Sequence, residues 1–280
     1  MKGQGRLYCA GWAVWDVRLR VESFPPTSAR TRVLERREDV GGPATVAALA
    51  AASLGTPALL LAHTGGDAGE KIRARLEALG GQAVLGATPD FITPIYTVLV
   101  APDGERFIFR EALPEPAVPD ELPQLGAEDV LLLDCRAPRL ALKLAHQAHD
   151  IGARVVLDFD RDEPEAWQLA ELSSHIVADE ALTMQLGGFA ALRSRLPNAE
   201  VVAATLGAAG VQTVTERIPA YRVDVLDSTG AGDVFHGAYA AALLNRHPAP
   251  FRYAAAAAAV RCRSGDLPTP QTVLSLMESQ

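Results

Sequence analysis

The 280-residue sequence lacks the features of several protein classes. Its three cysteines, Cys9, Cys135 and Cys262, lie far apart without CxxC spacing, so neither a disulfide framework nor a zinc site is indicated. No apolar run approaches the roughly 20 residues that a bilayer crossing needs, and the N-terminus has no export signal. We therefore expect a soluble protein in a reducing cytoplasm, with no membrane partner.

Positive charge is also in short supply. Lys and Arg total 26 against 34 Asp and Glu, which gives a net charge of −8. This is the wrong sign for a protein that binds the phosphate backbone of nucleic acid, so no nucleic-acid partner is expected. The 49% hydrophobic content is enough to fill a substantial core, as in an ordinary globular protein.

Common catalytic motifs are missing as well. The first apolar strand leads into GWAVWD (residues 11–16) instead of a GxGxxG turn, which disfavours a dinucleotide-dependent oxidoreductase. The sequence contains no Walker A loop, no GxSxG nucleophile and no HExxH helix, and its six histidines show no metal-ligand spacing.

From about residue 127 onward, short apolar runs alternate with amphipathic stretches. The runs are 130–135, 155–159, 175–179 and 201–206. This alternation predicts an α/β fold, with a mainly parallel sheet covered by helices on both faces, in a single domain spanning residues 1–280. Ligands of such folds bind at the carboxyl ends of the strands, where this sequence places polar residues.

Two segments follow a different pattern. Residues 30–40 and 93–111 alternate apolar and polar side chains, and the second contains Asp103-Gly104, a hairpin signal. They predict a small antiparallel sheet whose segments span approximately 17–40 and 91–113. It is expected to act as a lid, and also to join two chains in a homodimer; an ordinary edge extension of the main sheet is the alternative.

The most informative segment is DVLDSTGAGD (residues 224–233), which precedes the helical VFHGAYAAALL. Gly230 and Gly232 permit a tight turn whose backbone N–H groups, with the positive end of the helix dipole, form an anion cradle. Asp233, in the first helical turn, is placed to take the proton of an attacking hydroxyl during phosphoryl transfer. The helix N-terminus is expected to keep its carboxylate ionised. A capped helix start without chemistry is the alternative.

Two stretches resemble the signatures of the ribokinase family, also called the PfkB carbohydrate kinases. DSTGAGDVFHGAYAAAL (227–243) is similar to the C-terminal signature, while GGPA (41–44) with HTGGDAG (63–69) is similar to the N-terminal one. The resemblance implies a ribokinase-like fold with a small β lid. It also implies an enzyme that transfers a phosphoryl group from ATP, with Mg²⁺, to a hydroxyl of a small carbohydrate.

The resemblance also implies roles for individual residues. Asp233 is similar to the catalytic base, and the Gly230, Ala231 and Gly232 amides to the anion hole. The residues expected at the acceptor are Asp16, Gly41 and Gly42, and those expected at the nucleotide are Thr205, Gly207, Gly210 and Asp179. No metal ligands are assigned. Asp16 has a second reading as a turn cap.

Within the family, Asp134 and Arg136, LDFD (157–160) and His236 resemble the subgroup that contains sulfofructose kinase. This implies an anionic keto sugar, because a guanidinium group binds two oxygens of such an anion at once. Arg136, Arg30 and Arg110 are the candidate ligands. Arg30 and Arg110 have an alternative as solvated side chains or partners of Glu35, Glu38 and Glu111. His236 has an alternative as a packed residue beneath the anion hole.

Some positions depart from the family pattern. Val46 stands where an Asn that touches sugar hydroxyls is usual, and the N-x-x-E motif associated with magnesium appears as Asp179-Glu180-Ala181-Leu182. These changes leave one further interpretation open. The chain is then a catalytically weak or inactive relative that binds a sugar or nucleotide as a sensor.

Overall fold

The computed structural model describes residues 5–26, 29–85, 90–103, 105–111 and 115–280. In this part of the chain, nine strands form the main sheet in the order β13-β12-β11-β10-β9-β8-β1-β4-β5. Their bounds are β1 Leu7–Ala10, β4 Ala58–Leu61, β5 Gln82–Ala83, β8 Val130–Leu133, β9 Arg154–Phe159, β10 His175–Ala178, β11 Val201–Thr205, β12 Val211–Thr213 and β13 Arg217–Ile218. Neighbouring strands are parallel from β5 to β11, and β12 and β13 are antiparallel additions.

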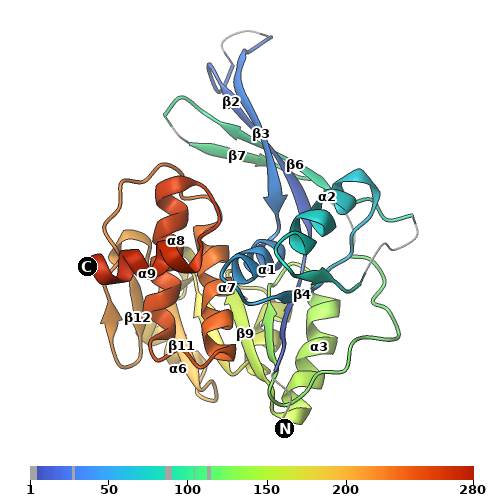
Figure 1. The fold of residues 1–280 in the computed structure, drawn as a ribbon, viewed down its shortest axis with the longest axis vertical. Coiled ribbons are helices and arrows are strands. Elements are labelled where there is room, and N and C mark those ends of the chain that lie inside the picture. The colour runs from blue at the N-terminus through green and yellow to red at the C-terminus, as the bar shows by residue number, and fades with distance from the viewer. Residues whose placement is uncertain (1–4, 27–28, 86–89, 104, 112–114) are drawn as a thin grey trace.

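Helices cover both faces of this sheet (Figure 1). One face packs against α1 Pro43–Ser53, α2 Gly66–Glu77, α7 Ala231–Leu244, α8 Pro250–Ser264 and α9 Pro270–Ser279. The other packs against α3 Pro138–Ile151, α4 Pro164–Glu171, α5 Glu180–Gln185 and α6 Phe189–Arg195, and a 3₁₀ turn, η1 Gly207–Ala209, follows β11. The predicted fold class is confirmed.

Successive side chains of each strand point to opposite faces of the sheet, which explains why the core has two layers, one on each face. In β1, Leu7 and Cys9 belong to the first core, while Tyr8 and Ala10 belong to the second. Successive side chains of a strand point to opposite faces, so a strand buried on both faces is apolar throughout. The continuous apolar runs of the sequence are therefore central strands.

The backbones of α1 and α7 are in direct contact. A Cβ atom at Gly237 would lie 2.2 Å from the carbonyl oxygen of Ala47. Both helices are rich in alanine along this contact, which lets their axes approach closely. The N-termini of α1 and α7, at Gly42 and Gly230, therefore open onto the same rim of the sheet.

A separate small sheet projects from that rim (Figure 1). Its order is β3-β2-β6-β7, with β2 Val14–Val21, β3 Val33–Gly41, β6 Ile95–Val100 and β7 Arg106–Phe109. The two outer pairs are antiparallel as expected, and the two central strands, β2 and β6, run parallel. Asp103 of the predicted turn is described, whereas Gly104 lies outside the described residues.

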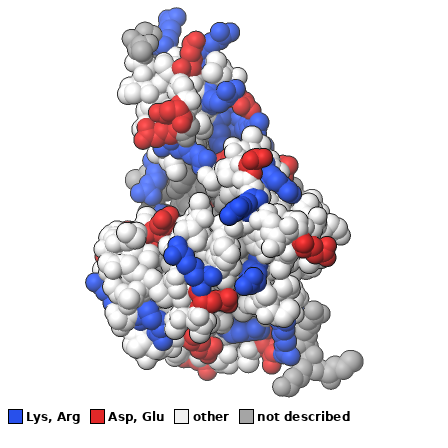
Figure 2. All heavy atoms as spheres, turned by 90° about the vertical axis from the view of Figure 1, so that its left-hand side faces the viewer, with Lys and Arg blue, Asp and Glu red and all other residues white. Residues whose placement is uncertain are grey.

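The charges are mixed over the surface. In the view of Figure 2, basic and acidic side chains are interspersed over the small sheet and the body below it. No helix in the described part of the chain is long and apolar enough to cross a bilayer.

Candidate active site

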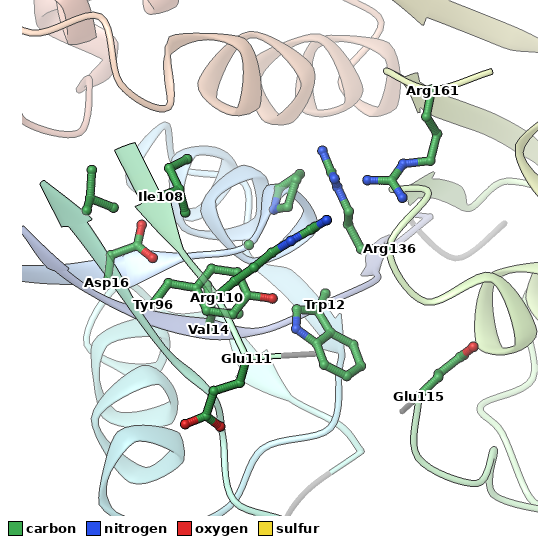
Figure 3. Close-up of a pocket in the computed structure, with 13 residues that line it drawn as sticks. Trp12, Val14, Asp16, Tyr96, Ile108, Arg110, Glu111, Glu115, Arg136 and Arg161 are labelled. Carbon is green, nitrogen blue, oxygen red and sulfur yellow. The ribbon is translucent and has the colours of Figure 1, made fainter. Parts of the chain in front are cut away.

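A first cavity, of about 430 Å³, lies between the small sheet and the carboxyl ends of β1 and β8 (Figure 3). Strands β2, β6 and β7 supply one wall, and the residues that follow β1 and β8 supply the other. The lining residues are Trp12, Val14, Asp16, Gly42, Pro43, Tyr96, Val98, Ile108, Arg110, Glu111, Glu115, Arg136 and Arg161.

Asp134 connects the segments that form this rim. Its carboxylate accepts hydrogen bonds from the backbone N–H groups of Trp12 (3.1 Å), Ala44 (3.1 Å) and Arg136 (2.8 Å). A Cβ atom at Gly11 would lie 2.1 Å from the same carboxylate, so a glycine is needed there. Burial raises the pKa of Asp134 to about 6 although these hydrogen bonds oppose the shift. The side chain thus joins the ends of β1, β8 and the start of α1.

The three residues predicted for the acceptor lie together. Gly42 adopts a φ of 91° at the start of α1, and a Cβ atom at Gly41 would lie 2.6 Å from Oδ1 of Asp16. Asp16 is inside strand β2, so its interpretation as a turn cap is wrong. Burial raises the pKa of Asp16 to about 6, with Arg18 opposing and Asp39 adding to the shift.

Three guanidinium groups point into one part of this cavity. Figure 3 shows Arg110, Arg136 and Arg161 pointing into the same space. Arg136 and Arg161 both pair with the single carboxylate of Asp160. Arg30 is not brought here: it is exposed and lies between β2 and β3, away from the residues that line the cavity. The carboxylates of Asp16, Glu111 and Glu115 line the same cavity, so three basic and three acidic side chains surround it.

Two lining residues were missed from the sequence. Arg161 follows β9 in the polar exit DFDRD, a pattern that gave no reason to prefer it over its neighbours. Trp12 has a buried indole N–H, and among the described residues that N–H has no hydrogen-bond partner. A buried donor without a partner costs free energy, so this N–H is available for a ligand in the cavity.

A second cavity, of about 580 Å³, lies beside the start of α7. Thr205, Gly207 and Gly210, predicted for the nucleotide, line it together with Ala231 and Gly232. Its walls also include the apolar side chains of Val211, Tyr221, Val223, Val225, Phe235, Ala255, Ala258 and Ala259. This cavity therefore combines apolar walls with a glycine turn at a helix N-terminus, an arrangement that can bind an anion.

Asp179 is not among the lining residues of this cavity. Its Oδ1 accepts a hydrogen bond from the backbone N–H of Leu182 (2.7 Å) and so caps α5. The neighbouring Glu180 is closer to the cavity, because a Cβ atom at Gly207 would lie 3.5 Å from its Oε2.

A tight glycine turn precedes α7, as expected from the sequence. Gly230 precedes α7 in the left-handed conformation, with a φ of 71°. Its carbonyl oxygen accepts the N–H of Val234 at 2.9 Å, so the helix begins at once. The N–H of Ala231 donates to the carbonyl oxygen of Ser228 at 3.3 Å, at the long end of the hydrogen-bond range.

Asp233 lies in the first turn of α7 and is not among the lining residues of either cavity. Ala231 and Gly232 next to it line the second cavity, while Asp134 and Arg136 of the first rim act on its charge. Desolvation, followed by the negative charge of Asp158, raises its pKa to about 7; His236 and Arg136 act the other way. The expected low pKa at a helix N-terminus is therefore wrong, because desolvation and like charges outweigh the dipole.

His236 packs beneath the turn. The side chain is 3% exposed, its Nδ1 lies 2.8 Å from the carbonyl oxygen of Gly232, and its Nε2 lies 3.4 Å from that of Val177. Asp158 Oδ1 lies 3.6 Å from the same Nε2. The burial of His236 and the backbone carbonyl oxygens beside both ring nitrogens favour the packing alternative over contact with a ligand.

The comparisons with known proteins agree with one another. The family model described as pfkB family carbohydrate kinase matches residues 4–272. The chain is 28% identical over 256 residues to the ATP-dependent ribose-1-phosphate kinase of Halopiger xanaduensis, covering 85% of each, and 29% identical over 240 residues to the 1-phosphofructokinase of Haloferax volcanii, covering 76% of this chain and 77% of that one. A putative ribokinase from Agrobacterium tumefaciens has a similar structure, with a TM-score of 0.84, 25% identity, and 99% and 98% of the two chains covered.

The pKa of Asp233 predicts how stability changes with pH. Its folded value of about 7 lies above the roughly 3.9 of an unfolded chain, so the native state keeps a proton that the unfolded state releases. The free energy of unfolding therefore falls as pH rises through this window. Asp233→Asn removes this loss, and we expect its melting temperature to exceed the wild type's by about 2–4 °C at pH 8, and by less at pH 5.

The control is Asp224→Asn, at an exposed carboxylate of the same segment. Thermal unfolding followed by circular dichroism at both pH values gives the comparison. An equal difference at the two pH values, or a less stable Asp233→Asn at pH 8, contradicts the prediction.

Proposed function

The chain belongs to the pfkB family of carbohydrate kinases, and we propose that it phosphorylates a hydroxyl of a small anionic sugar, with Asp233 as the general base. As a member of this family it is a phosphotransferase with an alcohol group as acceptor. The observation that supports the proposal is that Asp233 directly follows Ala231 and Gly232, which line the second cavity, and is close enough to Arg136 of the first cavity for that charge to act on its pKa.

ATP is proposed to occupy the second cavity. The apolar wall suits the adenine ring, and the turn at Gly230, Ala231 and Gly232 is proposed to bind the phosphates at the positive end of α7, where the N–H of Ala231 would exchange its long bond to Ser228 for a phosphate oxygen. Among the described residues, no group of three or more His, Cys, Asp or Glu side chains is placed to hold a metal. Mg²⁺ is therefore proposed to enter as part of the MgATP substrate, keeping much of its water shell.

Asp233 is proposed to orient the acceptor hydroxyl and to receive its proton as the oxygen attacks. A pKa of about 7 suits a general base that works near neutral pH. Asp16 and the backbone at Gly41 and Gly42 are proposed to bind the other hydroxyls, because they meet at one point of the cavity wall. Positioning in this way supplies most of the catalysis in phosphoryl transfer.

The anionic group of the acceptor is proposed to bind Arg110, Arg136 and Arg161. Arg136 and Arg161 share the carboxylate of Asp160, and an anion between the three guanidinium groups would accept charge-assisted hydrogen bonds from them. The indole N–H of Trp12 offers a further donor in the same cavity. Two similar enzymes carry names that specify phosphorylated sugars, which supports this class, and a phosphorylated or sulfonated keto sugar is our first candidate.

We propose that residues 1–280 work as a single domain. We also propose that the protein works in the cytoplasm, where ATP is available to it. The small sheet then acts as the lid, because its inner side forms one wall of the acceptor cavity. The sensor alternative predicts ligand binding without turnover. The glycine turn at Gly230 and the acidic Asp233 in the first turn of α7 support the kinase over the sensor.

An ADP-release screen tests the proposal. Fructose 1-phosphate, ribose 1-phosphate and sulfofructose are compared with fructose and ribose, at equal MgATP. We expect turnover with an anionic sugar, and a loss of about 100- to 10,000-fold in kcat for Asp233→Asn, because the proton acceptor is removed. Asp224→Asn should keep full activity. Thermal shifts with no ADP from any sugar would support the sensor instead.

Arg136→Gln tests the anionic end of the acceptor. We expect kcat/KM for the anionic sugar to fall by about 10- to 100-fold, because a charge-assisted hydrogen bond is lost, with a much smaller effect on its neutral analogue. Arg246→Gln, at an arginine 80% exposed, is the control. Equal losses for charged and neutral sugars would remove the assigned role of Arg136.

We also propose that two chains pair through their small sheets. The edge strands β3 and β7 expose Val33, Leu34, Ile108 and Phe109, and exposed apolar edges are seldom left uncovered in a monomer. Light scattering of the wild type should give the mass of a dimer. We expect Phe109→Glu to shift that mass toward the monomer, and a wild-type monomer at high concentration would exclude this pairing.

A further inference from the structure

Thr229, the residue before Gly230, is held through both of its backbone polar groups. Its N–H donates to Oδ1 of Asp227 (2.9 Å), and its carbonyl oxygen accepts from Nε of Arg261 (3.0 Å). The peptide that leads into the glycine turn is therefore fixed by two side chains, one from its own loop and one from α8.

Asp227 is in turn held by the small sheet. Its Oδ2 lies 2.7 Å from a terminal nitrogen of Arg18 on β2, and its Oδ1 lies 2.9 Å from one of Arg106 on β7. Burial acts to raise the pKa of Asp227, but the hydrogen bonds from Thr229 and the charges of Arg18 and Arg106 outweigh it and hold the pKa below its usual value. The carboxylate is thus ionised and shared between two strands and the turn.

Arg261 provides a second link to the same sheet. Its side chain is 7% exposed, and one of its terminal nitrogens lies 3.6 Å from Oδ2 of Asp39 on β3. The same nitrogen would lie 3.9 Å from a Cβ atom at Gly230. Two sets of contacts from the small sheet therefore reach Thr229. Arg18 and Arg106 reach it through Asp227, and Asp39 reaches it through Arg261.

We propose that the small sheet positions the phosphate-binding turn through Thr229, with Arg18, Asp227 and Arg261 as positioning residues. The inference rests on the proposed nucleotide site and extends it, because it makes nucleotide affinity depend on a sheet that lines the other cavity. Arg18 is two residues after Asp16 on the same side of β2, so an acceptor that orders this strand also orders the turn. The two substrates are coupled in this way.

The ion pair between Arg18 and Asp227 is buried enough for water and salt to screen it only weakly. Exposed surface ion pairs contribute little, since water and salt screen them. The Arg18 side chain is only 15% exposed, and that of Asp227 is 28% exposed. Arg20 is the natural contrast: it lies on the same strand and side of β2, is 56% exposed, and pairs with Glu35 of the small sheet itself.

The test compares Arg18→Gln with Arg20→Gln by titration with MgADP in the absence of sugar. We expect Arg18→Gln and Asp227→Asn each to weaken MgADP binding by about five- to tenfold, and the double variant to be no weaker than Asp227→Asn alone. Arg18→Lys, which keeps the charge, should recover part of the affinity. Arg20→Gln should bind MgADP as the wild type does.

Hydrogen exchange of the free protein supplies a second readout. Amides of residues 229–232 should exchange faster in Arg18→Gln than in Arg20→Gln, while those of the central strands keep wild-type protection. Unchanged MgADP affinity and unchanged exchange at the turn in Arg18→Gln would overturn the inference. Neither measurement needs a sugar, so a failed acceptor screen would refute the proposed acceptor and leave this result standing.

Discussion

The contact between the backbones of α1 and α7 brings the two halves of the site together. At Gly237 the helix α7 lies against the carbonyl oxygen of Ala47, at a distance that leaves no room for a side chain. The glycine starts of both helices, Gly42 and Gly230, are consequently neighbours on one rim, with the positive ends of two dipoles. Gly42 lines the first cavity, and Ala231, directly after Gly230, lines the second.

Two carboxylates on this rim, those of Asp134 and Asp158, are buried, so water screens their negative charge only weakly. Asp158 and Asp160 follow one another at the end of β9, and both have raised pKa values, first because of burial and then, for Asp158, because of the charge of Asp160. Arg136 lowers the pKa of each, and the burial of its own guanidinium is outweighed by these carboxylates. Arg136 therefore offsets part of the negative charge that these carboxylates place on the rim.

The small sheet does more than cover the acceptor cavity. One wall of that cavity consists of β2, β6 and β7, and the same strands β2 and β7 carry the arginines that bind Asp227. A sheet with mostly exposed strands has little core of its own, so its position depends on such contacts with the body. Ion pairs at its base therefore link its placement to the turn that receives the nucleotide.

The α/β class, the two central motifs and the existence of a small sheet could be read from the sequence, because they depend on local periodicity and on glycines at fixed spacing. Asp16 and Gly42 line the first cavity, with Gly41 beside Asp16, and Thr205, Gly207 and Gly210 line the second, whereas Asp179 and Asp233 are among the lining residues of neither. Only the tertiary structure decided that Arg161 enters the acceptor cavity and that Arg30 does not, because their positions depend on how strands far apart in the chain are arranged. The pKa of Asp233 was decided there too: desolvation and the charge of Asp158, 75 residues away in the chain, act on it more strongly than the local helix dipole from which its ionisation had been predicted.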